Sequence, residues 1–289
     1  MPRDGFVNEG RPSLTAQRVA RRRAEHQLWD DPVIFADPVA LPILGLDAAA
    51  VGAAPAGEHP AARALRAFLV ARSQFAEEAL AAAIERGVRQ YVILGAGLDT
   101  FAYRNPHAGV ALRIFEVDHP ATQVWKRQRV AQAGMCEPPL LTFVPVDFIH
   151  QDLALELVAT GFDRAQPAFF SWLGVSMYLS PDLVLETLRA LIALHPGNAV
   201  AFDYAVRPAP EDPHRPGFDA LAARVAQAGE PFRSFFEPAV LVTALRSIGY
   251  RAIEDLDSAQ INARYFSARS DGLRVRGSAH LMCAAGGDS

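Results

Sequence analysis

The fold is decided by the stretch YVILGAGLDT, residues 91–100, in which a short apolar run leads straight into a Gly-x-Gly turn. Such a run is typical of a strand buried on both faces of a parallel sheet. Gly95 and Gly97 leave out side chains where the backbone must turn tightly or approach a ligand closely. The turn alone is equally typical of an ordinary tight strand-to-helix connection, so the function must be sought in the neighbouring segments.

Short apolar runs alternate with amphipathic segments on the C-terminal side of this turn. We expect strands over residues 90–94, 113–117, 141–146, 168–173 and 199–203, and two later ones near 251–255 and 278–284. We expect helices over residues 120–133, 152–160 and 181–195, the last capped by Ser180. This βαβ repetition predicts an α/β fold with a doubly wound, mostly parallel sheet.

The expected core divides the chain into four segments. Residues 1–86 form an N-terminal helical cap, with helices near 14–28 and 61–86, that contributes to the ligand site. Residues 87–206 form the α/β core. Residues 207–248 are a Pro-rich insertion with helices near 219–228 and 238–248, which is a candidate lid. Residues 249–289 supply the strands that complete the sheet.

Composition limits the classes of function. The 289 residues are 51% hydrophobic and 21% charged, which is ordinary for a globular protein. A net charge of -4 provides no positive field for nucleic acid or an anionic membrane, so we expect a small-molecule partner. Two cysteines and no apolar run long enough to span a bilayer predict a reducing compartment, the cytoplasm. Nothing in the composition predicts an oligomeric state.

Acidic residues follow the second and third expected strands. Asp118 lies in the segment FEVDHP, residues 115–120, and comes 21 positions after Gly97, where an acid can bind ribose hydroxyls. It is better placed than Glu116, although an aspartate there could also cap a helix. Asp147 and Phe148 follow the third strand, where a carboxylate can accept from an adenine amine and a ring can pack on the base.

These features favour adenosylmethionine over a nicotinamide dinucleotide. The glycine turn lacks the third glycine of the dinucleotide fingerprint, and the chain has no Tyr-x-x-x-Lys pair for hydride transfer. We therefore predict a class I, Rossmann-like site for S-adenosyl-L-methionine, with S-adenosyl-L-homocysteine as the product.

The sequence resembles the leucine carboxyl methyltransferase family and its bacterial relatives from Ser13 to near the C-terminus. The resemblance rests on LGAGLDT (94–100), FEVDHP (115–120) with Lys126-Arg127, VDF (146–148) and GVSMYL (174–179). It implies that Arg72, in RSQF (72–75), pairs with the methionine carboxylate of the cofactor. It also implies a ribose contact by Asp118, adenine contacts by Asp147 and Phe148, and a lining role for Gly95 and Gly97.

Other residues are weaker candidates. Arg23 could serve the same polar end of the cofactor as Arg72. The family places a Glu where this chain has Leu173, which removes one expected cofactor contact. Tyr178, after the fourth strand, and Asp203-Tyr204, after the fifth, should face the crevice and could orient an acceptor.

Two histidines lie in these segments. His119 is expected to be structural, and His214 in the candidate lid could act as a base. We identify no metal site, because no carboxylate cluster stands out beyond the cofactor acids.

The predicted activity is methyl transfer to an oxygen, a carboxylate or a hydroxyl, of a small metabolite. Two alternatives stay open. One is methyl esterification of the C-terminal carboxylate of a protein or peptide. The other is a non-catalytic module that binds an adenosine nucleotide or a partner.

Overall fold

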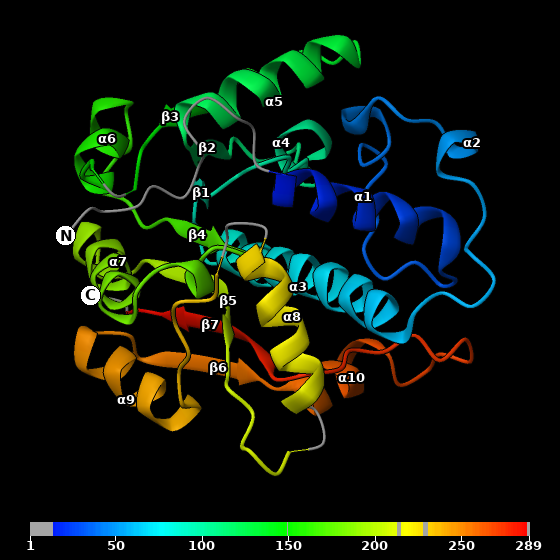
Figure 1. The fold of residues 1–289 in the computed structure, drawn as a ribbon. Coiled ribbons are helices and arrows are strands. Elements are labelled where there is room, and N and C mark those ends of the chain that lie inside the picture. The colour runs from blue at the N-terminus through cyan, green and yellow to red at the C-terminus, as the bar shows by residue number, and fades with distance from the viewer. Residues whose placement is uncertain (1–13, 149, 213–214, 228–230, 288–289) are drawn as a thin grey trace.

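A seven-stranded sheet forms the centre of the computed structural model, which describes residues 14–148, 150–212, 215–227 and 231–287 (Figure 1). The strands are β1 Gln90–Leu94, β2 Arg113–Asp118, β3 Leu141–Pro145, β4 Phe169–Trp172, β5 Ala199–Ala205, β6 Ala252–Leu256 and β7 Ala279–Ala285. Their order is β3-β2-β1-β4-β5-β7-β6, with β7 antiparallel to both of its neighbours and the other pairs parallel. The predicted doubly wound, mostly parallel sheet is confirmed.

Helices cover both faces of the sheet (Figure 1). One face packs on α3 (Pro60–Glu85), α4 (Phe101–Arg104) and α10 (Ser258–Tyr265). The other packs on α6 (Leu153–Ala159), α7 (Pro181–Leu194) and α9 (Pro238–Ile248). Side chains alternate between the two faces along a strand, and β1 therefore contributes to both cores: Tyr91 and Ile93 to the first, Val92 and Leu94 to the second. Near-continuous apolar strands are what a sheet covered on both faces requires.

The N-terminal helix α1 (Leu14–Trp29) lies outside these two layers. Its Ala20 and Ala24 pack in a third, smaller core with Leu98 of the glycine turn. Val130 of α5 (Pro120–Gln132) belongs to the same core. The packing therefore holds α1 against the segment that follows β1.

Capping residues fix several helix starts. Ser180 accepts a hydrogen bond from the backbone N–H of Leu183, and Pro181 occupies the first turn of α7, as the sequence predicts. His119 caps α5 by accepting a hydrogen bond from the N–H of Ala121, as a structural role requires, and it also lines the cavity described below.

The helices in the insertion and the short helices differ from expectation. Helix α8 (Arg215–Gln227) begins four residues before the predicted start at 219, because proline is tolerated in a first turn and Arg215 pairs with Asp219 at 2.9 Å. Helix α2 (Ala48–Val51) lies between the two helices expected in residues 1–86 and was not predicted. Helix α10 was not predicted, although Asp257 and Gln260 form a capping box before it.

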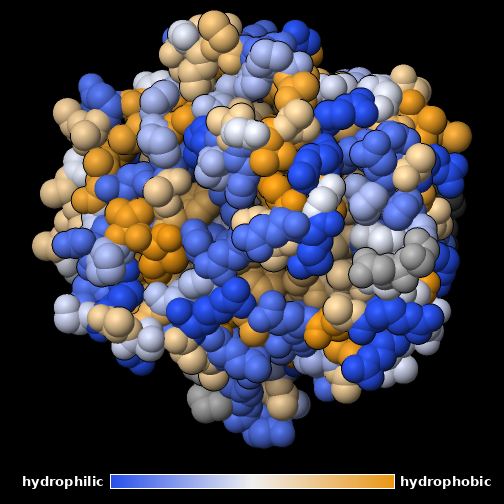
Figure 2. Space-filling model, turned by 180° about the vertical axis from the view of Figure 1, so that it is seen from behind, coloured by the Kyte–Doolittle hydropathy of each residue, from blue (hydrophilic) through white to orange (hydrophobic). Residues whose placement is uncertain are grey.

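The surface is mixed in character. On the face opposite to the view of Figure 1, hydrophobic residues occur in small groups separated by hydrophilic ones (Figure 2). In the described part of the chain, none of the helices combines the length and the apolar character that crossing a bilayer requires.

Candidate functional site

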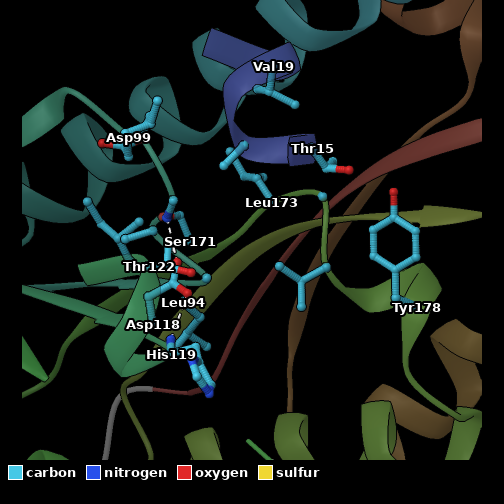
Figure 3. A pocket seen from close by; sticks show the side chains of 18 of the residues that line it. Thr15, Val19, Leu94, Asp99, Asp118, His119, Thr122, Ser171, Leu173 and Tyr178 are labelled. Atoms are coloured by element: carbon cyan, nitrogen blue, oxygen red, sulfur yellow. Dashed lines mark hydrogen bonds between the residues drawn. The ribbon is translucent and has the colours of Figure 1, made fainter. Parts of the chain in front are cut away.

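A cavity of about 220 Å³ lies at the carboxyl ends of β1, β2 and β4, beside the segment that follows β3. Strand order reverses between β1 and β4, and open α/β sheets bind ligands at such a switch point. Helix α1 borders the cavity through Thr15 and Val19, which lie across from the strand ends (Figure 3). The cavity therefore has walls from both the sheet and the N-terminal helix.

The two glycines of the turn are required by close contacts. Gly95 has φ +67°, and a Cβ there would lie 2.5 Å from a methyl of Val175. Gly97 has φ +48°, and a Cβ there would lie 3.0 Å from the Cβ of Ala16 in α1. Both line the cavity. The two glycines thus allow the backbone to turn with positive φ, and they also allow α1 and the segment after β4 to approach the turn closely.

Asp118 is locked beneath this turn. Its Oδ2 accepts from the backbone N–H of Gly97 at 2.6 Å, and its Oδ1 accepts from the N–H of His119 at 2.7 Å. Burial raises the pKa of the Asp118 carboxyl, and the two backbone hydrogen bonds oppose that shift. The two backbone hydrogen bonds therefore fix the side chain where it lines the cavity.

Glu116 occupies a different environment on the same strand. It is 1% exposed and does not line the cavity, and its Oε2 lies 2.6 Å from the Nζ of Lys126 in α5. Burial raises the pKa of the Glu116 carboxyl to about 7, although the Lys126 ammonium opposes the shift. Of the two acids in the motif, only Asp118 reaches the cavity.

Asp147 and Phe148 line the cavity beyond β2, directly after β3. Asp147 Oδ2 lies 2.7 Å from Nδ1 of His150, and the side chain of Asp147 is 33% exposed. Phe148 packs at the edge of the core on the α6 side. This end of the cavity is therefore a partly open rim with one carboxylate and one ring.

Two arginines line the cavity from the helical cap. Arg72 in α3 is 7% exposed, and its Nη1 donates to Asp203 Oδ2 at 3.0 Å. Arg23 in α1 is 4% exposed, and its Nη2 donates to the carbonyl of Leu98 at 2.5 Å. The Nη1 of Arg23 lies 3.8 Å from Asp99, which also lines the cavity. Both predicted cationic residues are brought to one cavity.

The structure separates the two tyrosine candidates. Tyr178, in the 3₁₀ turn η2 (Ser176–Tyr178), lines the cavity on the side away from Asp118 (Figure 3). Tyr204 is fully buried and does not line it; its hydroxyl donates to Asp255 at 2.8 Å and lies 3.2 Å from Nδ1 of His280.

The expectation that Asp203 and Tyr204 face the crevice is wrong. Strand β5 continues to Ala205, so both residues lie within the strand and point to opposite faces. Asp203 contacts Arg72 in α3, whereas Tyr204 packs in the core beneath α7 and α9. His214 lies outside the described residues.

The sequence model of the leucine carboxyl methyltransferase family matches residues 16–192. The chain belongs to the leucine carboxyl methyltransferase family. YktD of Bacillus subtilis, which carries the name of an S-adenosyl-L-methionine-dependent methyltransferase, is 36% identical over 219 residues, 74% of this chain and 71% of that protein. A similarly named protein of Mycolicibacterium gilvum is 31% identical over 246 residues, 80% of this chain and 76% of that protein.

Solved structures share the fold of this methyltransferase. A protein of Thermobifida fusca named as a methyltransferase gives a TM-score of 0.59 at 16% identity, with 97% of each chain covered. A DUF574 family protein of Streptomyces avermitilis gives 0.58 at 16% identity, over 93% of this chain and 97% of that one. At this identity the likeness concerns the fold alone. By its family, the chain is an S-adenosyl-L-methionine-dependent methyltransferase.

Several cavity residues of this methyltransferase were not predicted. Asp99 follows the glycine turn within the quoted motif and could have been found there. Thr15 and Val19 come from α1, and no local pattern in a helix shows that it will cross a distant turn. Leu173, at the position of the family Glu, lines the cavity with an apolar side chain. The described residues include no group of three or more His, Cys, Asp or Glu side chains placed to hold a metal ion.

Proposed function

We propose that this methyltransferase binds S-adenosyl-L-methionine across the carboxyl ends of the parallel strands and methylates an oxygen of a small metabolite. The observation that carries the proposal is the position of Asp118, fixed by Gly97 and lining one cavity with Asp147, Phe148 and Arg72. When bound, the cofactor supplies an activated methyl group on a sulfonium.

The residues after β2 and β3 suit the adenosine end. A carboxylate accepts about four hydrogen bonds, so Asp118 keeps acceptor capacity for ribose hydroxyls beyond its two backbone bonds. Asp147 offers a carboxylate to an exocyclic amine, and the ring of Phe148 offers a surface for the base. The matching of donors and acceptors supports adenosine here.

The arginines suit the amino-acid end. A guanidinium presents a planar fork of donors that matches a carboxylate, and the bond is strengthened where water is excluded. Arg72 and Arg23 are both almost fully buried and both line the cavity. We assign the main carboxylate contact to Arg72 and a supporting position to Arg23.

The side of the cavity near Tyr178 suits an acceptor that is already anionic. The lining residues contributed by α1, α3 and the segment after β4 include no histidine and no carboxylate, so the described residues offer no general base there. A carboxylate is ionised at pH 7 and needs none, whereas a hydroxyl benefits from one. We therefore favour a carboxylate acceptor oriented by the Tyr178 hydroxyl.

The protein's contribution to such a reaction is alignment and exclusion of water. The leaving group of an in-line displacement at a sulfonium is neutral, so little charge has to be stabilised as it departs. Walls from α1 and from the segment after β4 lie on the side where an acceptor must approach. Their apolar members, Val19, Leu173 and Val175, would exclude water from the attacking oxygen.

A panel of acceptors tests this function. Purified protein is incubated with radiolabelled S-adenosyl-L-methionine and, separately, with small carboxylic acids, phenols, alcohols and a peptide with a free C-terminus. We expect label in base-labile methyl esters of a small carboxylic acid. Transfer to the peptide alone would support the protein-directed alternative, and binding of the donor without transfer to any acceptor class would support a non-catalytic module.

A further inference from the structure

Asp203 is a fully buried carboxylate that does not itself line the cavity but contacts two residues that do, Arg72 and Gly174. Its Oδ2 accepts from Nη1 of Arg72 at 3.0 Å, and its Oδ1 accepts from the backbone N–H of Gly174 at 2.6 Å. Its backbone carbonyl also accepts from the Ser176 hydroxyl at 2.5 Å. One residue of β5 thus connects a helix of the cap to the segment after β4.

The guanidinium of Arg72 lies directly over Gly174. A Cβ at Gly174 would lie 2.8 Å from Nη1 and 2.9 Å from Nη2 of Arg72, and the residue has φ +73°. Any side chain there would push the guanidinium away from Asp203. The bare backbone at Gly174 is therefore part of what lets Arg72 reach both Asp203 and the cavity.

The strand that carries Asp203 is held firmly from its other face. Tyr204 is fully buried and its hydroxyl is bound to Asp255 on β6, with His280 of β7 beside it. Residues Ala199–Ala205 pair in register with Ala285–Ala279 of β7. Because β5 cannot shift without breaking these contacts, the Asp203 carboxylate is a fixed point.

We infer that Asp203 is a positioning residue that sets the orientation of Arg72, and with it the preference of the site for ligands that carry an amino-acid carboxylate. The inference rests on the proposed role of Arg72 at the cofactor. Both partners of the Asp203 carboxylate are donors, and only a group with two acceptor oxygens satisfies both. An arginine held on one edge presents its remaining N–H groups in a fixed direction, which reduces the ordering cost of binding.

Asp203→Asn tests the inference, because asparagine keeps the shape but must turn an NH₂ toward one of the two donors. Binding of S-adenosyl-L-homocysteine and of 5′-methylthioadenosine, which lacks the carboxylate, is measured by isothermal titration. We expect about a tenfold or larger loss of affinity for the first ligand, from misplacement of a charge-assisted pair, and a change within about twofold for the second. Arg72→Ala should show the same selectivity, and adding Asp203→Asn to it should cost little more.

Asp257→Asn is the matched control. It makes the same change at a carboxylate whose Oδ1 also accepts from a backbone N–H, that of Gln260, but which does not line the cavity, and it should leave both affinities unchanged. If Asp203→Asn does not fold, Gly174→Ala carries the test, since it displaces the guanidinium while both charges stay. The same selective loss is expected from it.

The outcomes distinguish a failure of the positioning role of Asp203 from a failure of the proposed function. An equal loss of affinity for the two ligands would overturn the positioning role of Asp203. So would unchanged affinities in both Asp203→Asn and Gly174→Ala. Tighter binding of S-adenosyl-L-homocysteine by Asp203→Asn would also overturn it, because Asp203 would then only compete with the ligand for Arg72. Failure of the unsubstituted protein to bind either ligand would instead refute the proposed function.

Discussion

At the scale of single residues, Asp118 is the side chain whose environment points most directly to a ligand. It is a carboxylate held by two backbone N–H groups at the mouth of a strand, with its remaining lone pairs free to meet a polar group in the cavity. An aspartate needed only to cap a helix would not have to line a cavity, and here His119 is the cap of α5.

Replacing Asp118 measures that role. We predict that Asp118→Ala weakens binding of S-adenosyl-L-homocysteine by about 1–3 kcal/mol, the usual result of leaving ligand hydroxyls without a charged acceptor, while the protein stays folded. Isothermal titration gives the affinity and circular dichroism the fold. Asp152→Ala, which removes the N-cap of α6 away from the cavity, is the control. A folded Asp118→Ala variant that binds as tightly as the original chain would show that the ribose assignment is wrong.

Substitutions of Arg72 test the amino-acid end. Arg72→Ala should reduce affinity for S-adenosyl-L-homocysteine by about 2–4 kcal/mol if the pair is desolvated. Arg72→Lys should lose less, because an ammonium keeps the charge but not the bidentate fork. The comparison ligand is 5′-methylthioadenosine, whose binding should hardly change. An equal loss for that ligand would mean that Arg72 acts through packing alone.

The sequence could predict those residues of the candidate site that follow a strand in a recognisable local pattern. Gly95, Gly97, Asp118, Asp147 and Phe148 follow buried strands, and parallel strands place such residues at one edge, so the sequence brings them together. Arg72 and Arg23 lie in helices with no such rule; the family resemblance selected Arg72, and Arg23 was a candidate only as a second guanidinium for the same polar end of the cofactor. Tyr204 was misplaced because a strand two residues longer than expected changes which residues leave the sheet.

At the scale of elements, the contact between α1 and α3 contains a buried charged cluster. Arg66 of α3 donates to both oxygens of Asp30, at 2.8 and 3.0 Å, and also binds Glu58. His26 Nδ1 lies 2.8 Å from Asp30, while its Nε2 accepts from the N–H of Ile34 at 2.9 Å. The cluster fixes the helix that forms one wall of the cavity.

This cluster predicts an acid-dependent stability. Burial alone would raise the pKa of Asp30, but the hydrogen bonds from His26 and Arg66 outweigh it and lower the pKa from 3.8 to about 2. A depressed folded-state pKa contributes stability that is complete above the unfolded value and is lost as the pH falls through the folded value. The contribution is on the order of 2 kcal/mol.

Urea unfolding of the original chain and of Asp30→Asn measures the contribution of the Asp30 carboxylate to the free energy of unfolding. The difference in unfolding free energy between the two proteins should shrink by roughly 2 kcal/mol as the pH falls from about 5 toward 2, because only one of them gains a proton on Asp30. A difference that stays constant over this range would show that the carboxylate has an ordinary pKa in the folded protein.

Most of the helices and strands could be predicted from the sequence. Strand β1 and helix α9 were placed with the right bounds, since apolar runs, glycine and proline mark their ends. The observed start of α8 precedes the predicted one because Pro216 occupies the first turn of the helix, where proline is tolerated. Four-residue helices such as α2 and α4 are too short to show a helical period at all.

At the scale of the whole molecule, the site exists because distant segments meet at one edge of the sheet. Helices α1 and α3 come from before the first strand, yet Thr15, Arg23 and Arg72 line the same cavity as the ends of β1, β2 and β4. The sequence predicted the sheet and its ligand edge from local patterns. The walls that face an acceptor depend on how α1 and the segment after β4 pack, and this is why the acceptor itself could not be read from local motifs.

The most direct test of the central claim is the thermal unfolding midpoint of the protein with S-adenosyl-L-homocysteine and, separately, with NAD. A ligand that binds only the folded state stabilises it by RT ln(1 + [L]/Kd), about 2.7 kcal/mol at a hundredfold excess over Kd. We predict a clear rise in the midpoint with S-adenosyl-L-homocysteine and none with NAD. A rise with NAD alone would contradict the assignment of this cavity to an adenosylmethionine cofactor.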